Sequence, residues 1–144
     1  MKSVSRPAPT VSAKVGLFIA HAASKTGVSE QQLFKATGFT PSNDPDARIP
    51  LALETELWNT AEKLSNDADF GLHAAENIRP GAFDVFDYAV RTAPNLASAL
   101  QRMVRYNRLV HDLATFNVVE QSNKISIEHR FNSADIRPCT ACPC

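Results

Sequence analysis

Hydrophobic positions in the first forty residues recur with the spacing of two short helices. Between residues 12 and 25 the apolar side chains return at helical intervals, which is typical of an amphipathic helix that ends near Gly27. They are Val15, Phe18, Ile19 and Ala22. Ser29 and Gln32 have the spacing of a capping box and predict a second helix, which Gly38 ends. Its inner positions are Leu33, Phe34 and Thr37.

A third helix is expected after a connector of turn residues over 39–48. Pro50 is predicted in its first turn, where the missing N–H removes no helical hydrogen bond. Asn66 and Asp67 end this helix, and Trp58 is expected on the flank of its buried stripe. The stripe consists of Leu53, Leu57, Ala61 and Leu64. Asp67 or Asp69 can cap a short fourth helix over residues 70–75.

Two further helices are expected after the turn signal Arg79-Pro80-Gly81. Residues 83–91 favour a short helix, with a strand as the lesser alternative. The strongest periodic pattern of the chain begins at Pro94-Asn95, and Leu109 and Val110 extend it. Its apolar positions are Leu96, Ala99, Leu100, Met103 and Val104.

After Asp112 the hydrophobic pattern changes to a period of two. Apolar residues alternate with polar ones on both sides of a turn at residues 121–123, which predicts a β-hairpin. The predicted fold is therefore α+β: a mainly helical N-terminal part of about five to six helices, followed by a β-hairpin in an incomplete sheet. Because a lone hairpin is marginal in water, the apolar face of Ile125, Ile127 and Phe131 predicts self-association or poor solubility.

The composition is that of a soluble globular domain. The 144 residues include 15 basic and 15 acidic side chains, and this balance argues against a chain whose main role is to hold a phosphate backbone. No apolar run approaches the roughly 18 residues that span a bilayer. The apolar segment 15–20 is too short for the core of a signal peptide. We therefore expect a cytoplasmic protein without a membrane partner.

Residues 12–38 are a candidate helix-turn-helix. Ala23, Gly27 and Leu33 stand at the relative positions of its small residue, turn glycine and apolar residue. The expected reading helix over residues 30–35 carries one acid and one base, Glu30 and Lys35, and phosphate contacts need more positive charge. A small DNA-binding protein is therefore the alternative function, and two packed helices without DNA are the favoured interpretation.

An arginine-rich stretch near the end of the helical part is a candidate site for an anion or a nucleic acid. It comprises Arg91, Arg102, Arg105, Tyr106 and Arg108. Helix surfaces with several arginines are usually solvated, and Asp112 and Glu120 are available as ionic partners. The favoured interpretation is a solvated helix face.

Three cysteines near the end of the chain offer a metal site that the sequence does not favour. Cys139, Cys142 and Cys144 have metal-like spacing, and His129 is a candidate fourth ligand. Because the cysteines crowd into the last six residues, a tail without metal is favoured. The chain also lacks a glycine-rich phosphate loop and a local nucleophile–base motif. We therefore expect no metal, no cofactor and no enzymatic activity.

An ordered series of motifs in the middle of the chain resembles one protein family. The motifs are Asp44-Pro-Asp-Ala-Arg-Ile-Pro50, Leu57-Trp58, Asp69-Phe-Gly-Leu72, Arg79-Pro-Gly-Ala-Phe83, Tyr88-Ala-Val-Arg91, Leu96 with Ala99-Leu100, and Arg105-Tyr106. Together they resemble the N-terminal effector-sensing ("arabinose-binding-like") domain of AraC-type bacterial transcriptional regulators, over residues 12–131.

The resemblance implies an unidentified small-molecule effector and a homodimer as partners. It also implies contact with promoter DNA only through a C-terminal helix-turn-helix module, which we expect to be missing from a truncated chain. The expected organisation is a flexible arm over 1–11, a partial sensing domain over 12–131 and an unstructured cysteine-containing tail over 132–144. Arg105 and Tyr106 are the candidate ligand residues, because a guanidinium beside an aromatic ring suits a small acidic ligand.

Overall fold

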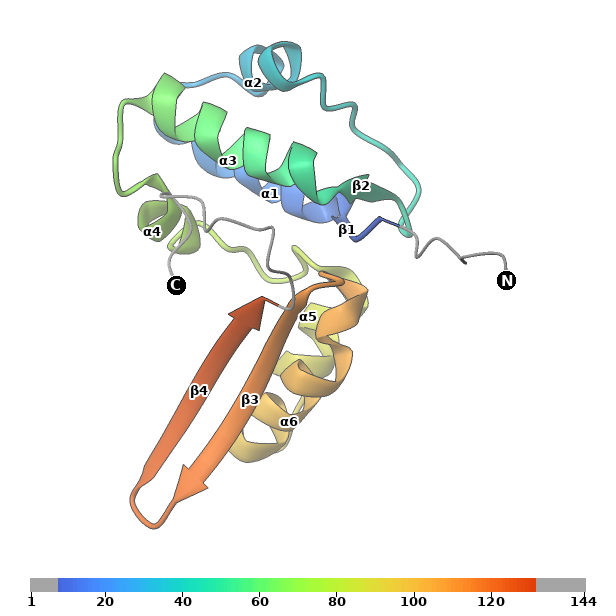
Figure 1. The fold of residues 1–144 in the computed structure, drawn as a ribbon, viewed down its shortest axis with the longest axis vertical. Coiled ribbons are helices and arrows are strands. Elements are labelled where there is room, and N and C mark those ends of the chain that lie inside the picture. Colours follow the sequence, from blue (N-terminus) through green and yellow to red (C-terminus); the bar gives the residue numbers. More distant parts are fainter. Residues whose placement is uncertain (1–7, 132–144) are drawn as a thin grey trace, which may run out of the picture.

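The computed structural model describes residues 8–131, which form two parts joined by short strands (Figure 1). The first part, the N-terminal layer, contains β1 (Thr10–Ser12), α1 (Ala13–Ser24), α2 (Glu30–Thr37), β2 (Arg48–Pro50), α3 (Leu51–Ser65) and α4 (Phe70–Ala75). The second part, the C-terminal unit, contains α5 (Asp84–Arg91), α6 (Leu96–Tyr106), the 3-10 helix η1 (Asn107–Leu109), β3 (Ala114–Gln121) and β4 (Lys124–Phe131). The predicted α+β class, with its helices before a hairpin, is confirmed.

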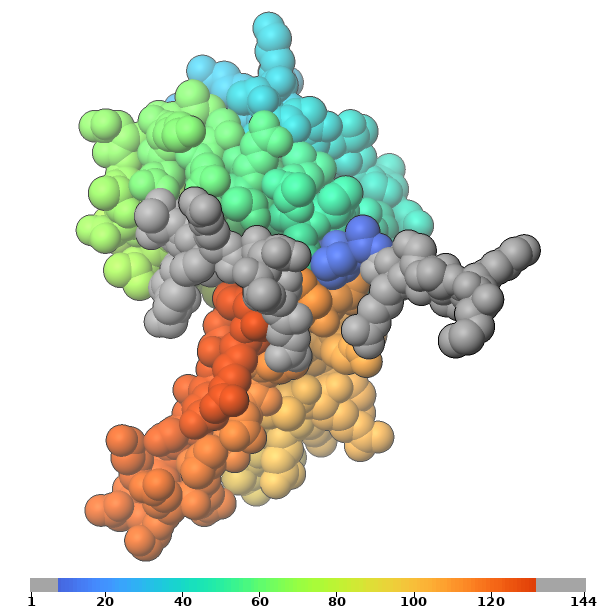
Figure 2. Space-filling model, viewed as in Figure 1, coloured from blue at the N-terminus to red at the C-terminus, as the bar shows by residue number. Residues whose placement is uncertain are grey.

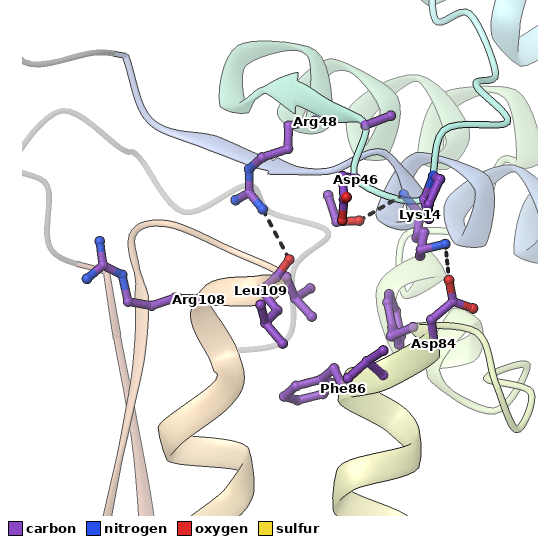
Figure 3. Close-up of a pocket in the computed structure, with 13 residues that line it drawn as sticks. Lys14, Asp46, Arg48, Asp84, Phe86, Arg108 and Leu109 are labelled. Atoms are coloured by element: carbon purple, nitrogen blue, oxygen red, sulfur yellow. Dashed lines mark hydrogen bonds and ion pairs between the residues drawn. The ribbon is translucent and has the colours of Figure 1, made fainter.

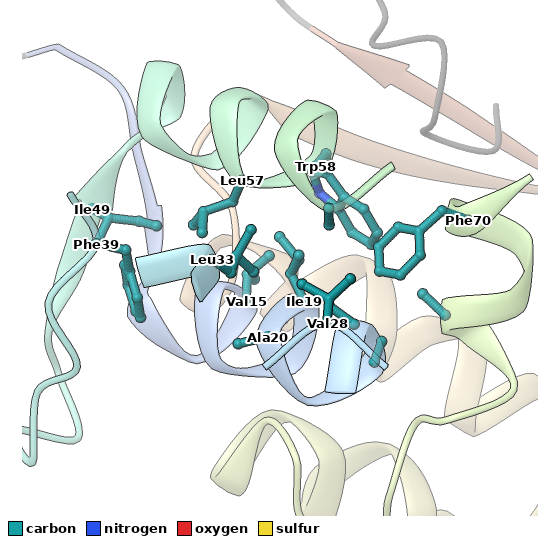
Figure 4. Close-up of a cluster of buried hydrophobic side chains, with 14 of the residues drawn as sticks. Val15, Ile19, Ala20, Val28, Leu33, Phe39, Ile49, Leu57, Trp58 and Phe70 are labelled. Carbon is teal, nitrogen blue, oxygen red and sulfur yellow. The ribbon is translucent and has the colours of Figure 1, made fainter. Parts of the chain in front are cut away.

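One hydrophobic core holds the N-terminal layer together (Figure 4). Ile19, Leu33 and Leu57 contribute side chains with no exposed surface from three different helices. Small residues let α1 approach its neighbours closely: a Cβ built on Gly16 would lie 2.7 Å from Cε2 of Phe39. The core therefore depends on tight packing around α1 rather than on a few large side chains.

The predicted helix ends of α1 and α2 are confirmed in part by side-chain caps. Ser12 Oγ accepts a hydrogen bond from the N–H of Lys14 at 3.3 Å. Ser29 Oγ accepts from the N–H of Gln32, and Gln32 Oε1 accepts from the N–H of Ser29, which is the predicted capping box. Gly38 ends α2 with a φ of 73°, a conformation that favours glycine.

Helix α3 differs from its prediction in three details. Pro50 adopts an extended conformation as the last residue of β2 and lies just before the helix rather than in its first turn. Trp58, expected on the flank, is in the core, where its ring lies 6.1 Å from that of Phe18. Leu64, expected to be buried, is 46% exposed. The buried residues of α3 are Leu57, Trp58 and Ala61, and Leu64 lies in the last turn of the helix.

Helix α4 has no side-chain cap of the predicted kind. Asp69 precedes the helix, but its carboxylate makes no capping hydrogen bond. The carboxylate of Asp67 instead accepts from the N–H of Asp69 at 3.1 Å and contacts Nδ1 of His73 at 2.7 Å. Asp67 therefore stabilises the turn before α4 and not its first N–H groups.

Two strands that the sequence did not predict connect the two parts. β1 pairs antiparallel with β2, and Val11 lies opposite Ile49. On the other edge of β1, Ser12 N–H donates to the carbonyl of Val110 at 2.7 Å. Val11 has no exposed surface and lies in β1, although residues 10 and 11 were predicted to belong to a flexible arm over 1–11. Three-residue strands are too short for a periodic pattern to indicate them.

In the C-terminal unit, α5 packs against α6 and α6 packs against β3. Residues 84–91 are a helix, so the strand alternative for this segment is wrong. Asn95 caps α6 through its side chain, which accepts from the N–H of Ser98 at 2.9 Å, at the predicted start. The apolar stripe of α6 is only partly covered: Leu100 is 9% exposed, whereas Leu96 is 67% exposed.

The predicted hairpin is confirmed, and it projects from the rest of the molecule (Figure 2). β3 and β4 pair in register from Ala114 opposite Phe131 to Gln121 opposite Lys124. Ile125 and Ile127 are 44% and 51% exposed, so their apolar face lacks a cover within the described residues. The predicted cysteine-containing tail over residues 132–144, with Cys139, Cys142 and Cys144, lies outside the described residues, as do residues 1–7.

Candidate functional site

A cavity of about 360 Å³ lies between the N-terminal layer and the C-terminal unit (Figure 3). We call it the junction pocket. The start of α1, the segment before β2, the start of α5 and the end of η1 all contribute to its lining. Its lining residues are Ser12, Lys14, Pro45, Asp46, Ala47, Arg48, Phe83, Asp84, Val85, Phe86, Arg108, Leu109 and Val110. Most of its exposed lining surface is apolar, and five charged residues also line it, so it offers both kinds of contact to a small molecule.

Arg48 ties the two sides of the junction pocket together. Its Nε donates to Oγ1 of Thr10 at 2.7 Å, and its Nη2 donates to Oδ1 of Asp112 at 2.9 Å. Its Nη1 donates to the carbonyl of Leu109 at 3.1 Å (Figure 3). One guanidinium thus reaches from β2 across β1 to the end of η1, because its planar fork can serve several acceptors at once.

Asp112 completes this polar connection. Its Oδ2 accepts from the N–H and from the hydroxyl of Thr10, each at 2.8 Å. Burial alone would raise the pKa of Asp112, but these two hydrogen bonds and the charges of Arg48 and Arg108 together lower it below its usual value. Asp112, expected as a partner for the α6 arginines, therefore pairs with Arg48.

An ion pair between Lys14 and Asp84 forms the opposite side of the junction pocket. It joins the first turn of α1 to the first residue of α5. Asp84 has a φ of 44°, in the left-handed region that non-glycine residues rarely adopt. Such backbone strain is common where a ligand or a switch acts. The Phe18 and Phe83 rings, 6.0 Å apart, make a second contact between α1 and the start of α5.

Two charged groups of the junction pocket have no ionic partner among residues 8–131. They are the carboxylate of Asp46 and the guanidinium of Arg108. In Figure 3 Asp46 lies on one side of Arg48, and the guanidinium of Arg108 lies on the other side and is directed away from Asp46. Apolar surface from Phe86 and Leu109 lies within the same pocket. The arrangement suits a small ligand with a short apolar body and charged ends.

Behind the junction, a buried histidine connects α3 to the base of the hairpin. His111 Nδ1 accepts from the N–H groups of Leu113 at 3.1 Å and Ala114 at 3.0 Å. On the other side of the ring, Nε2 lies 3.3 Å from Oε2 of Glu54. The sequence showed only scattered histidines, and this contact between residues far apart in the chain had no local signal.

The arginine-rich stretch does not form one site. Arg102 donates from Nη1 to the carbonyl of Ala89 at 2.8 Å, and Arg91 pairs with Asp87 within α5. Arg105 lies 5.4 Å from the ring centre of Tyr106. These two predicted ligand residues line a depression of about 300 Å³ on α6, whereas Arg108 lines the junction pocket. Arg102 also lines the α6 depression, but its hydrogen bonds tie α6 to α5.

The predicted helix-turn-helix segment forms two packed helices, and the two exposed charges on α2 balance each other. Ala23 and Leu33 are fully buried between α1 and α2, and Gly27 has a φ of 91° in the turn. Glu30 and Lys35 are both exposed on α2. The packing is compatible with the motif, and the surface of α2 offers no excess of positive charge for a phosphate backbone.

His129 is packed among aromatic rings on the hairpin. It stacks on Phe116 with ring centres 4.6 Å apart, and its ring centre lies 4.7 Å from that of Phe131. Burial, and secondarily the nearby His111, lower the pKa of His129. Within residues 8–131 no three His, Cys, Asp or Glu side chains gather as a metal site. No helix of the described part is long and apolar enough to cross a bilayer.

Sequence reasoning missed most of the junction pocket. Arg48 was noticed only as part of a motif at the entry of α3, and Asp84 and Asp46 were not singled out. Their roles depend on contacts between segments more than thirty residues apart, such as the hydrogen bond from Arg48 to Asp112. The positive φ of Asp84 has no sequence signal beyond the tolerance of aspartate for that conformation.

Comparison with known proteins gives two matches. Residues 27–141 match the family model described as the arabinose-binding domain of the AraC transcription regulator, N-terminal. The chain is also similar to the ornithine utilization regulator of Pseudomonas aeruginosa, with 29% identity over 86 residues. That alignment covers 58% of this chain and 25% of the regulator, so the match spans a quarter of the regulator's length.

Proposed function

Because this chain belongs to the family of N-terminal arabinose-binding domains of AraC transcription regulators, we propose that the junction pocket is its effector site. The family consists of regulatory sensing domains and is not an enzyme family. A sensing domain needs a place where a small molecule touches two parts that can change their arrangement. The junction pocket has this property.

The observation that carries the proposal is that both parts of the molecule line one pocket. Lys14, Asp46 and Arg48 come from the N-terminal layer, and Phe86 and Leu109 come from the C-terminal unit. A ligand that contacts both sides binds more tightly to one relative placement of the two parts. Its differential affinity then shifts the population toward that placement, which is the requirement for a sensor.

We propose an effector of the amino-acid class, with an ammonium group, a carboxylate and a short aliphatic chain. Asp46 would accept the ammonium group, Arg108 would bind the carboxylate, and Phe86 and Leu109 would cover the chain. The printed name of the Pseudomonas aeruginosa relative, an ornithine utilization regulator, supports the same class. L-ornithine is therefore the first probe.

The test is thermal unfolding of the chain with and without L-ornithine. At ten times its Kd a ligand stabilises the folded state by about 1.4 kcal/mol, which raises Tm by roughly 4 °C for a domain of this size. Asp46→Asn should abolish the shift, whereas the matched control Glu76→Gln, an exposed acid outside the pocket, should retain it. Equal shifts in both variants would contradict the proposed site.

Arg105 and Tyr106 are proposed as a second, weaker contact for an acidic ligand. Their support is the depression on α6, where the guanidinium of Arg105 lies beside the Tyr106 ring. Arg105→Gln should leave unchanged the Tm shift that L-ornithine causes. The same variant should weaken the binding of a small dicarboxylate probe such as succinate. Loss of the ornithine shift in this variant would move the effector site from the junction pocket to α6.

We also propose a homodimer as the partner state, with promoter DNA bound by a helix-turn-helix module of the whole regulator. The exposed apolar face of the hairpin supports self-association. The alternative, DNA binding by residues 12–38, predicts a gel shift that weakens steeply with salt and with Lys35→Gln. If this polypeptide gives no sequence-specific footprint on DNA, that result supports the sensing role.

A further inference from the structure

A second cavity of about 340 Å³ lies beside the junction pocket and shares Lys14 with it. It is bounded by α1 and by the segment over residues 77–82 that precedes α5. We call it the basic cavity, because Lys14, His21 and Arg79 are the ionisable residues of its lining. No part of the proposed effector site requires it.

The charge of the basic cavity is one-sided. Its lining contains no aspartate or glutamate, in contrast to the junction pocket with Asp46 and Asp84. Arg79 has no hydrogen bond or ion pair from its side chain to any other residue within 8–131. Because Lys14 is paired with Asp84 outside this lining, Arg79 supplies the unpaired positive charge of the cavity, which favours an anion.

An electrostatic effect independently indicates that two of these groups, His21 and Arg79, lie close together. Burial, and then the charges of Arg79 and Lys25, lower the pKa of His21. The His21 ring is therefore close enough to Arg79 for their charges to interact. Leu17 and Phe18 add apolar surface to the same cavity.

We propose that the basic cavity binds a small oxyanion, the phosphate or carboxylate group of a metabolite, between Lys14, His21 and Arg79. Arg79 provides a planar fork for two oxygens, and Lys14 and His21 provide single donors. The site is separate from the effector site proposed above and does not depend on it.

The carboxylate of Asp84 competes with the oxyanion for Lys14. Lys14 is held by Asp84, whose side chain is 52% exposed and whose backbone has a positive φ of 44°. An anion that takes Lys14 removes one of the two contacts that fasten the start of α5 to α1. The other contact is the pairing of the Phe18 and Phe83 rings. Anion binding therefore loosens α5 at the edge of the junction pocket.

The experiment titrates the full chain with sodium phosphate and, separately, with sodium succinate, at constant ionic strength set with sodium chloride. Fluorescence of Trp58, the one tryptophan of the chain, reports binding, because the Phe18 ring lies in the cavity and 6.1 Å from the indole. Isothermal titration calorimetry checks the stoichiometry. The two ions separate phosphate from carboxylate as the preferred group, and saturable one-to-one binding of either that Arg105→Gln leaves unchanged supports the proposal.

Three variants make the test specific. Arg79→Gln should weaken binding about fivefold or more, since a charge-assisted bidentate contact is lost. Asp84→Asn should tighten it about twofold to fivefold, because the competitor for Lys14 loses its charge. Lys35→Gln, which removes an exposed positive charge on α2, should leave the affinity unchanged.

Two results would overturn the proposal. One is the absence of saturable binding by both ions. The other is equal weakening by Arg79→Gln and Lys35→Gln, which would reveal only a general response to net charge. Neither result depends on L-ornithine, so a failure of the effector proposal and a failure of this one can be told apart.

Discussion

Both parts of the molecule contain amphipathic helices, most strongly so in the C-terminal unit, but the two parts are packed very differently. All sixteen residues of the hydrophobic core belong to the N-terminal layer or to the loops between its elements. In the C-terminal unit only Leu100 and Ala114 are buried apolar residues, and α5 has no buried residue. Val85 and Tyr88 on α5 are 69% and 71% exposed. An apolar stripe therefore shows that a helix needs a partner surface, and it does not show that the partner is present among the described residues.

This difference suits a sensor. The N-terminal layer supplies the frame. The C-terminal unit is fastened to it mainly by polar contacts, among them Arg48 with Asp112, Lys14 with Asp84, and the strand edge at Val110. Segments with few buried apolar contacts open at lower free energy than a closed core. A ligand at the junction can shift such a unit with little binding energy.

The largest expected effect is the truncation of a core side chain in the N-terminal layer. Leu57→Ala removes a fully buried side chain and should lower the free energy of unfolding by about 3 kcal/mol. Its counterpart in the C-terminal unit, Val85→Ala, should change it by less than about 0.5 kcal/mol. Urea denaturation followed by Trp58 fluorescence measures both. Similar losses of unfolding free energy in both variants would contradict the difference in packing between the two parts.

Close packing around α1 predicts the second-largest loss of stability. Gly16→Ala places a Cβ 2.7 Å from Cε2 of Phe39 and 3.3 Å from Cδ1 of Leu57. The core must shift to accept it, so the variant should lose about 1–3 kcal/mol, despite the higher helix propensity of alanine. The same denaturation assay applies. A gain in stability would mean that the N-terminal layer is as loosely packed as the C-terminal unit.

The contacts of Asp112 between the two parts contribute less to stability, and their contribution depends on pH. The folded state holds the pKa of Asp112 below its reference value of 3.8, so this group stabilises the fold above that pH. The stabilisation is lost as the pH falls from 3.8 through the lowered pKa. Asp112→Asn should cost about 1 kcal/mol at pH 7, since its side chain is partly exposed, and should flatten the acid limb of the stability curve. Unchanged acid dependence in this variant would contradict the assigned role.

The smallest effect on stability is expected on the hairpin face. Ile127→Thr replaces a side chain that is 51% exposed, so the free energy of unfolding should change by less than about 0.5 kcal/mol. Self-association, measured by sedimentation velocity, should nevertheless decrease, because exposed apolar surface is removed. A stable monomer before substitution would contradict the proposed homodimer through this face.

The accuracy of the sequence predictions follows the same division. Local signals placed α2 with its capping box, α6 with Asn95 at its start, and the hairpin with its alternation, because each signal lies within a few neighbouring residues. Position relative to the core was harder: Trp58 is in the centre and Leu64 is exposed. The junction pocket could not be predicted, since Arg48 reaches Leu109 and Asp112 only after folding brings distant segments together.

The central claim, that a closed frame carries a weakly fastened unit, is tested most directly by native-state hydrogen exchange read by mass spectrometry. The predicted result is an opening free energy for amides of α5, α6 and β4 that is lower than that of α1 and α3 by about 2 kcal/mol or more. Equal opening free energies in both parts would contradict it.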